Sequence, residues 1–203
     1  MKIFVTGIDT NVGKTVVAGI LASALKYDYW KPIQSGDLQN SDSIKVRRWL
    51  DRGQKIHKES IRLKNPLSPH ESARLDKKEI TLDQFELPKK EKLIIEGAGG
   101  LMVPLNDKGD CIIDLIKQLD AKTVLVSKNY LGSINHTLMS CHVLASNGIQ
   151  NMGIIINGEP NPASEEIITA ISGVPILGHV HWTPKISKQF IQEESKKFKK
   201  IFE

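Results

Sequence analysis

Short apolar runs alternate with helix-like segments along the whole 203-residue chain. The runs are rich in Ile, Val and Leu at consecutive positions, a pattern typical of strands that are buried on both faces. We expect strands at residues 3–7, 28–32, 92–97, 122–127, 152–158 and 174–180. We expect helices at residues 14–26, 41–52, 111–119, 134–148, 163–172 and 185–202. This alternation predicts an α/β fold in which a parallel sheet carries helices on both faces.

The chain has no repeat and no linker rich in Pro, Gly or Ser, so we expect residues 1–203 to form a single domain. Residues 56–92 are the least regular part and include the segments "KNPLSPHES" and "ELPKKEK". We expect long loops there, and such loops often carry binding residues.

Composition narrows the class of protein. Charged residues make up 25% and hydrophobic residues 40%, as in ordinary soluble proteins. No apolar run approaches the ~20 residues that span a bilayer, and "MKIFVTG" does not resemble a signal peptide. We therefore expect a cytoplasmic protein without membrane contact, in which Cys111 and Cys141 are free thiols.

The net charge of +5 fits either nucleic acid or phosphate-bearing ligands. Much of the excess lies in residues 185–202, whose apolar positions recur at roughly helical spacing, as in an amphipathic surface helix. The chain has no helix-turn-helix motif, zinc motif or aromatic-rich basic patch. We therefore expect no nucleic-acid partner.

The segment "GIDTNVGKT", residues 7–15, connects the first strand to the first helix. It is similar to the phosphate-binding pattern G-x-x-x-x-G-K-[ST], with one extra residue between Gly7 and Gly13. Backbone N–H groups at a helix start cradle phosphates, Lys14 places a charge on the β- and γ-phosphates, and the Thr15 hydroxyl can bind Mg²⁺. The nucleotide-binding residues predicted here are Asn11, Val12, Gly13, Lys14, Thr15 and Val16. We expect the rim from Asp9 to Asn11 to lie between triphosphate and substrate.

A magnesium nucleotide site also needs carboxylates. Glu96 ends the strand in "KLIIEGAGG" at the edge where α/β sheets bind ligands, and the glycines Gly97, Gly99 and Gly100 then let the backbone approach a ligand closely. We expect Glu96, Gly97, Ala98 and Gly99 to bind the nucleotide. Asp42 is the second candidate. The alternatives are a solvated acid at a strand end for Glu96 and a helix cap for Asp42.

Lys31 in "WKPIQSG" ends the second strand at the same edge of the sheet. A second cation near the γ-phosphate would stabilise a phosphoryl group in transfer or an anionic substrate. The alternative is an ordinary surface lysine.

Seven segments occur in the order of the ATP-dependent dethiobiotin synthetases, a family that the chain closely resembles. They are "VTGIDTNVGKT", "KPIQSG", "NSD", "LSPH", "IEGAGGLMVPL", "LGSINHTL" and "IIIN". The phosphate loop resembles the family's G-T-D-T-x-V-G-K-T, with the same extra residue. Ile8 replaces the usual Thr, and Asn11 stands where an acid is common.

The resemblance implies a parallel sheet of about seven strands, like that of the P-loop NTPases, in a homodimer. The family uses MgATP to join CO₂ to 7,8-diaminopelargonate, through a carbamate and a carbamoyl phosphate, and closes a cyclic urea. Its site residues correspond by resemblance to residues of this chain. They are Thr15, Asp42 and Glu96 for Mg²⁺, Lys14 and Lys31 for the carbamate and γ-phosphate, Ser35 for the diamine, Gly132 and Asn135 of the neighbouring subunit for the substrate carboxylate, and Asn157 for adenine.

Two departures concern the base site. Asn157 is followed by Gly158 instead of the family's common Asp, and the last strand runs into "HVHWTP" instead of a Pro-Trp pair. His179 and His181 alternate, so they would share a face of that strand. They are either a metal-binding pair or loop residues near the nucleotide base.

Other functions with the same fold are also open. A partitioning or targeting ATPase usually carries an extra lysine early in K-G-G-x-x-G-K-T, whereas here no lysine precedes Lys14 in the loop and Asp9 adds a negative charge. A ligase or amidase relative could use the same ATP site with another acid substrate.

Overall fold

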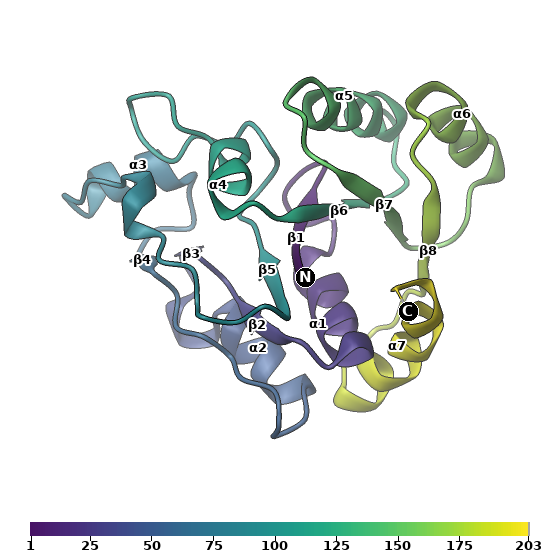
Figure 1. Cartoon of the computed structure of the whole chain (residues 1–203), viewed down its shortest axis with the longest axis horizontal. Coiled ribbons are helices and arrows are strands. Elements are labelled where there is room, and N and C mark those ends of the chain that lie inside the picture. Colours follow the sequence, from purple (N-terminus) through teal and green to yellow (C-terminus); the bar gives the residue numbers. More distant parts are fainter. Residues whose placement is uncertain (203) are drawn as a thin grey trace.

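The computed structural model describes residues 1–202 and has a central sheet of six parallel strands in the order β2-β5-β1-β6-β7-β8 (Figure 1). The strands are β1 Lys2–Gly7, β2 Asp28–Trp30, β5 Leu93–Glu96, β6 Lys122–Ser127, β7 Asn151–Asn157 and β8 Ile176–Val180. A separate two-stranded parallel sheet pairs β3 Ile33–Ser35 with β4 Ile61–Leu63.

Helices cover both faces of the central sheet. Figure 1 shows α1, α2 and α7 on one face and α4, α5 and α6 on the other. The helices are α1 Lys14–Leu25, α2 Asp42–Trp49, α3 Pro69–Leu75, α4 Ile112–Leu119, α5 Ser133–Ser146, α6 Pro162–Ser172 and α7 Lys188–Phe202. Two short 3₁₀ helices are η1 Leu38–Asn40 and η2 Leu82–Gln84. Within residues 1–202, no helix is long and apolar enough to cross a membrane.

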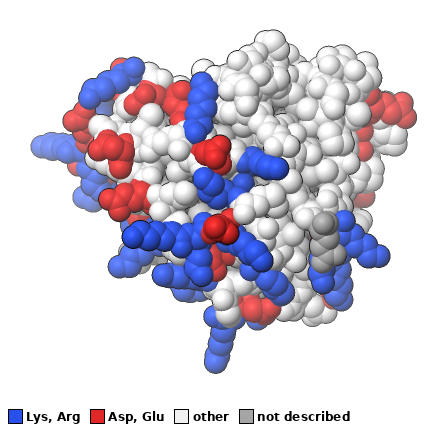
Figure 2. All heavy atoms as spheres, viewed as in Figure 1, with Lys and Arg blue, Asp and Glu red and all other residues white. Residues whose placement is uncertain are grey.

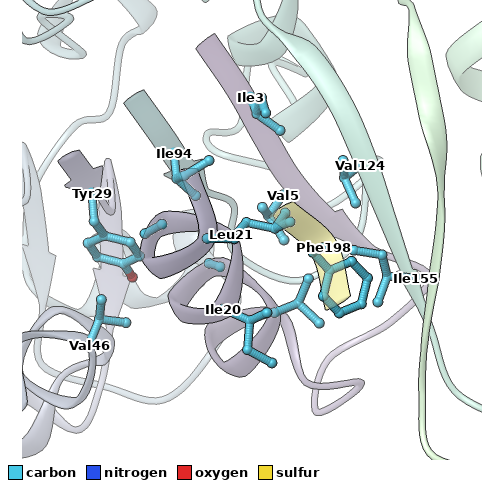
Figure 3. Packing of buried hydrophobic residues seen from close by; sticks show 14 of the residues in the cluster. Ile3, Val5, Ile20, Leu21, Tyr29, Val46, Ile94, Val124, Ile155 and Phe198 are labelled. Atoms are coloured by element: carbon cyan, nitrogen blue, oxygen red, sulfur yellow. The ribbon is translucent and has the colours of Figure 1, made fainter. Parts of the chain in front are cut away.

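Alternate residues of each strand pack into different cores. Val5 of β1 belongs to the core built with Leu21 of α1 and Phe198 of α7, which Figure 3 shows from close by. Its neighbour Phe4 belongs to the core that contains Leu115 of α4. All five side chains are almost fully buried, and each contributes about 1.5–3 kcal/mol by leaving water. Burial on both faces explains the continuous apolar runs in the sequence.

The predicted α/β fold with a parallel sheet and helices on both faces is confirmed. The central sheet has six strands, and the seven-strand expectation came from the family resemblance. Residues 56–92 are more ordered than expected, because they contain β4, α3 and η2. β3 (IQS) and β4 (IRL) each have a polar residue at the centre, so they lack the continuous apolar run that predicted the buried strands, and sequence alone reads them as loops.

Strand register brings two predicted site residues together. Tyr29 of β2 is in register with Ile94 of β5, and Trp30 is in register with Ile95. Lys31 follows Trp30, so it comes next to Glu96. Tyr29 and Ile94 lie in the core beneath α1 and α2. Because side chains two residues apart on a strand share a face, Lys31 and Glu96 point toward the N-terminal ends of α1 and α2.

Candidate functional site

A cleft of about 940 Å³ lies at the carboxyl ends of β1, β2 and β5. This volume is typical of small-molecule sites, and the carboxyl edge is where α/β sheets bind ligands. Its lining residues come from six parts of the chain. They are Thr10, Asn11, Gly13, Lys14, Thr15 and Val16 of the phosphate loop; Lys31, Ile33, Gln34 and Ser35; Asp42, Lys45 and Trp49 of α2; and Pro66–Pro69, Glu96, Ala98, Gly99, Val103 and Ile186.

The phosphate loop is held in place by a residue from the far end of β7. The side-chain amide of Asn157 donates to the Val12 carbonyl oxygen at 2.9 Å. Gly13 has φ of 98°, and a Cβ there would lie 2.1 Å from Nδ2 of Asn157, so only glycine fits. Gly13 also caps α1 with no side-chain hydrogen bond. The backbone N–H groups of the first turn are therefore available for an anion.

Thr15, Lys31 and Asp42 converge around the carboxylate of Glu96. Oε1 of Glu96 accepts from the Thr15 hydroxyl at 2.8 Å and from the Lys31 ammonium at 2.9 Å. The same ammonium lies 2.8 Å from Oδ2 of Asp42 and donates to the Gly97 carbonyl oxygen at 3.1 Å. Lys31 is therefore a buried cation between two carboxylates, and the surface-lysine alternative is excluded.

Burial and charge shift the pKa values of this cluster in different directions. Burial raises the pKa of Glu96, and Lys31 only partly offsets that effect. For Asp42, burial also favours the neutral acid, but the Lys31 ammonium outweighs burial and lowers the pKa. Burial disfavours the charged form of Lys31, yet Glu96 and Asp42 together raise its pKa. Lys31 thus stays protonated between its two partners.

Lys14 experiences the opposite balance. Burial, assisted by repulsion from Lys31, lowers the pKa of Lys14 from 10.5 to about 8. Its ammonium donates to the backbone carbonyl of Asp9 at 2.8 Å and has no ion pair within the described residues. The loop therefore holds a buried positive charge that a bound anion would stabilise.

The oxygen atoms around Lys31 suit a hard divalent cation. A hydroxyl and two carboxylates, from Thr15, Asp42 and Glu96, are the donors that Mg²⁺ prefers. Across residues 1–202, no group of three or more His, Cys, Asp or Glu side chains is gathered to hold a metal. A cation here would need further oxygens from a bound phosphate, as is common for Mg²⁺ in ATP sites.

Asp42 is not the cap of its helix. Ser41 occupies the N-cap position, and Asp42 is the first residue of α2. Its side chain bonds to Lys31 and, at 3.3 Å, to Lys45. Its backbone N–H donates to the Gln34 side chain at 3.2 Å. Both alternatives from the sequence, the capping Asp42 and the solvated Glu96, are therefore wrong, since Glu96 is only 1% exposed.

Ser35 lines the cleft, and its hydroxyl oxygen is buried with no hydrogen-bond partner in the described part of the chain. A buried hydroxyl without a partner costs about 1–3 kcal/mol, so a ligand that bonds to it would recover this energy. Of the predicted rim, Thr10 and Asn11 line the cleft, whereas the Asp9 carboxylate bonds to the N–H of Thr10.

Five predicted residues do not line the cleft. Val12 and Gly97 are buried and take part through their backbone carbonyls, and Asn157 supports the loop. Gly132 and Asn135, at the start of α5, are exposed. The structure does not bring these two residues to the cleft of the same chain.

His179 and His181 do not form a metal pair. His179 lies 3.0 Å from the carboxylate of Glu165 on α6, and His181 lies 3.2 Å from that of Glu194 on α7. Each histidine therefore has its own carboxylate partner on a different helix.

Sequence reasoning missed three residues of this site: Tyr29, Gln34 and Lys45. The Tyr29 hydroxyl donates to Oε2 of Glu96 at 2.6 Å. Tyr29 could have been found, because it precedes Lys31 by two positions and shares its side of the strand. Gln34 and Lys45 gave no such signal, since their roles depend on how the chain folds back against α2.

Comparisons with known proteins show the family to which the chain belongs. A family model described as an AAA domain matches residues 1–189. The ATP-dependent dethiobiotin synthetase of Christiangramia forsetii is 47% identical over 199 residues, covering 97% of this chain and 95% of that protein. That of Cytophaga hutchinsonii is 47% identical over 193 residues, covering 94% and 93%.

Among solved structures, the cell division ATPase MinD of Pyrococcus furiosus is similar in fold. Its TM-score is 0.61 at 14% identity, covering 98% of this chain and 99% of that one. A ParA family ATPase of Chlorobium tepidum has a TM-score of 0.52 at 15% identity, covering 98% and 91%. At such identities the likeness shows the fold alone.

Proposed function

The chain belongs to the family of ATP-dependent dethiobiotin synthetases, and we propose that its cleft uses ATP to join CO₂ to 7,8-diaminopelargonate. The products are dethiobiotin, ADP and phosphate, which makes the chain an ATP-dependent ligase that closes a ring. The observation that carries the proposal is the buried Lys31 ammonium between Glu96 and Asp42, beside the phosphate loop.

The reaction proceeds in three steps. One amine of the diamine adds to CO₂ and loses a proton, giving a carbamate. A carbamate oxygen then attacks the γ-phosphorus of ATP, so that the bond to ADP breaks and a carbamoyl phosphate forms. The second amine attacks the carbamoyl carbon and loses a proton, phosphate leaves with the bonding electrons, and the cyclic urea is complete.

Lys14 and Lys31 supply the positive charge that these reaction steps require. Carbamate and triphosphate are both anions, so they repel each other unless cations lie between them. Lys31 is protonated and buried, and Lys14 carries a charge that its own surroundings do not balance. Fixed cations in a cleft stabilise the charge that develops during phosphoryl transfer.

The donor set fits a magnesium ion, which Thr15, Asp42 and Glu96 would hold. When bound, such an ion neutralises charge on the β- and γ-phosphate oxygens. Lys31 now balances the two carboxylates. With such an ion at Asp42 and Glu96, the Lys31 ammonium would be available to contact the carbamate or the γ-phosphate.

The remaining contacts are assigned by family resemblance and by position. Ser35 would bond to the diamine, in keeping with its buried hydroxyl without a protein partner. Asn157 would recognise adenine, because its amide offers a second N–H and a carbonyl oxygen beyond the bond to Val12.

Gly132 and Asn135 would bind the substrate carboxylate of a neighbouring subunit in a homodimer. Both residues are exposed and lie away from the cleft of their own chain. The surface over α5 has few charged side chains in Figure 2, and Leu131 and Met139 are exposed there at 104% and 58%. Apolar side chains on a surface poor in charge are typical of subunit interfaces. We also propose that residues 1–203 act as one domain, in the cytoplasm.

The test is ADP release by the purified protein with MgATP, bicarbonate and 7,8-diaminopelargonate, and with bicarbonate or the diamine left out. We expect release only in the complete mixture. Release at the same rate without the diamine or without bicarbonate would contradict the proposal and would favour an ATPase of another kind.

A further inference from the structure

Tyr29 places a phenol hydroxyl in the core beneath the cleft. The side chain is fully buried, and its hydroxyl donates to Oε2 of Glu96 at 2.6 Å. A tyrosine hydroxyl in a core needs a partner, and the partner here is a carboxylate that faces the nucleotide cleft. The contact therefore links the core directly to the candidate cation site.

The two oxygens of the Glu96 carboxylate have separate partners. Oε1 accepts from Thr15 and Lys31, both of which line the cleft. Oε2 accepts from Tyr29, which does not line the cleft. A carboxylate bonded in this way cannot rotate to present both oxygens to the cleft without losing the tyrosine bond.

Packing fixes the tyrosine ring as well. Tyr29 is in register with Ile94 of β5, and Figure 3 shows its ring between Ile94 and Val46 of α2. Glu96 follows Ile94 by two residues, and α2 begins at Asp42. The ring thus belongs to the same core as residues of both elements that carry the carboxylates of the candidate cation site.

We propose that Tyr29 is a positioning residue that sets the cation preference of this site, because it restricts Glu96 to one oxygen, Oε1, toward the ion. Mg²⁺ requires a compact octahedral shell and takes few protein oxygens, whereas Ca²⁺ accepts more ligands and often binds both oxygens of one carboxylate. The arrangement of Tyr29 and Glu96 therefore favours Mg²⁺ over Ca²⁺. This inference rests on the proposed role of Glu96 as a cation ligand.

The test compares the wild type with Tyr29→Phe, which keeps the ring and removes the hydroxyl. Titration calorimetry would measure the dissociation constants of Mg²⁺ and Ca²⁺ with a non-hydrolysable ATP analogue at saturation. Loss of a residue that orients a metal ligand typically weakens metal binding about 10–100-fold, so we expect Tyr29→Phe to bind Mg²⁺ at least ~10-fold more weakly. The affinity for Ca²⁺ should fall less, so the preference for Mg²⁺ over Ca²⁺ should decrease. An unchanged ratio of the two constants would overturn the proposal.

Tyr27→Phe is the matched control, because Tyr27 lies two residues away at the edge of the same core and has no bond to Glu96. It should leave both constants unchanged. In a Glu96→Gln background, Tyr29→Phe should no longer change the ratio, because the effect acts through the carboxylate. A ratio that falls equally in that background would mean that the tyrosine has only a general effect on the fold.

A measurement on the wild type covers the case in which Tyr29→Phe fails to fold. The infrared stretching bands of carboxylates differ between one-oxygen and two-oxygen binding of a cation. We expect the bands of one-oxygen binding with both Mg²⁺ and Ca²⁺, and bands of two-oxygen binding with Mg²⁺ would overturn the proposal. None of these experiments contains the diamine, so they can succeed even if the chain makes a product other than dethiobiotin.

Discussion

The Lys31 ammonium lies 2.9 Å from Oε1 of Glu96, and neither side chain is more than 6% exposed. Two buried charges in contact are stable only together, because removing one leaves the other uncompensated. In this protein the pair lies where a nucleotide and its cation would bind. We therefore propose two tasks for Lys31, which are to balance the carboxylates before ligands enter and to meet an anion afterwards.

The first prediction concerns turnover. Lys31→Gln should lower kcat at least ~100-fold, the scale of losing one oriented charge in a transition state, while the Kd of MgATP stays within a few-fold. Steady-state kinetics and nucleotide titration would measure the two quantities. Lys26→Gln, at an exposed lysine paired with Asp51, should change neither. Near-normal kcat would remove Lys31 from the mechanism.

The second prediction concerns cation binding without nucleotide. Because the Lys31 ammonium already contacts Asp42 and Glu96, it should oppose a divalent ion at the same carboxylates. Lys31→Met should therefore bind Mn²⁺ at least ~10-fold more tightly than the wild type does, given the repulsion between like charges a few ångströms apart. Electron paramagnetic resonance of free Mn²⁺ would measure this. Lys26→Met is the control. Equal Mn²⁺ affinities of Lys31→Met and the wild type would show that Lys31 does not compete with the divalent ion for the two carboxylates.

The third prediction follows from the pKa of Lys14, which burial lowers to about 8 in the folded protein. Between pH 8 and 10.5 the unfolded chain binds more protons at Lys14 than the folded chain does, so the free energy of unfolding should rise with pH in that window. Below pH 8 the folded protein bears the full cost of burying the Lys14 ammonium. The lowering of the Lys14 pKa from 10.5 to about 8 corresponds to a cost of about 3 kcal/mol, at ~1.4 kcal/mol per pKa unit. Lys14→Met should thus stabilise the nucleotide-free protein at pH 7, and less so at pH 10.

Urea unfolding at pH 7, 9 and 10 would test this, with Lys26→Met as an exposed control. A stability difference that does not change with pH would contradict the buried charge. The same substitution should weaken ATP binding, because the loop then lacks its cation for the phosphates.

The fourth prediction concerns the subunit arrangement. If Asn135 serves the cleft of a neighbouring subunit, Lys31→Gln and Asn135→Ala variants should each be inactive alone. Mixing equal amounts with subunit exchange should restore about a quarter of wild-type activity, because half of the dimers are mixed and each of these has one intact site. No recovery, despite mixed dimers seen by native mass spectrometry, would place Asn135 outside the shared site.

Much of this site was predictable because it depends on local order along the chain. The phosphate loop follows a buried strand and precedes a helix, so Gly13, Lys14 and Thr15 could be assigned directly. Lys31 and Glu96 end apolar strands, and parallel strands place such ends at one edge. These residues all line the cleft in the structure.

Other features depend on tertiary contacts that no local pattern reveals. Sequence could not show that Asn157 holds the loop at Val12, 145 positions away, or that Gln34 bonds to the start of α2. The contact of Lys31 with both Asp42 and Glu96 also depends on how β2, β5 and α2 are placed relative to one another, which the sequence does not show. The β3–β4 sheet was missed because each strand has a polar residue at its centre and lacks a continuous apolar run.

The most direct test of the central claim is to follow the carbon of ¹³C-bicarbonate with purified protein, MgATP and 7,8-diaminopelargonate. Nuclear magnetic resonance and mass spectrometry would identify the labelled product. We predict that the label appears in the ureido carbonyl of dethiobiotin, in an amount equal to the ADP formed. ADP formation without labelled cyclic urea would contradict the account.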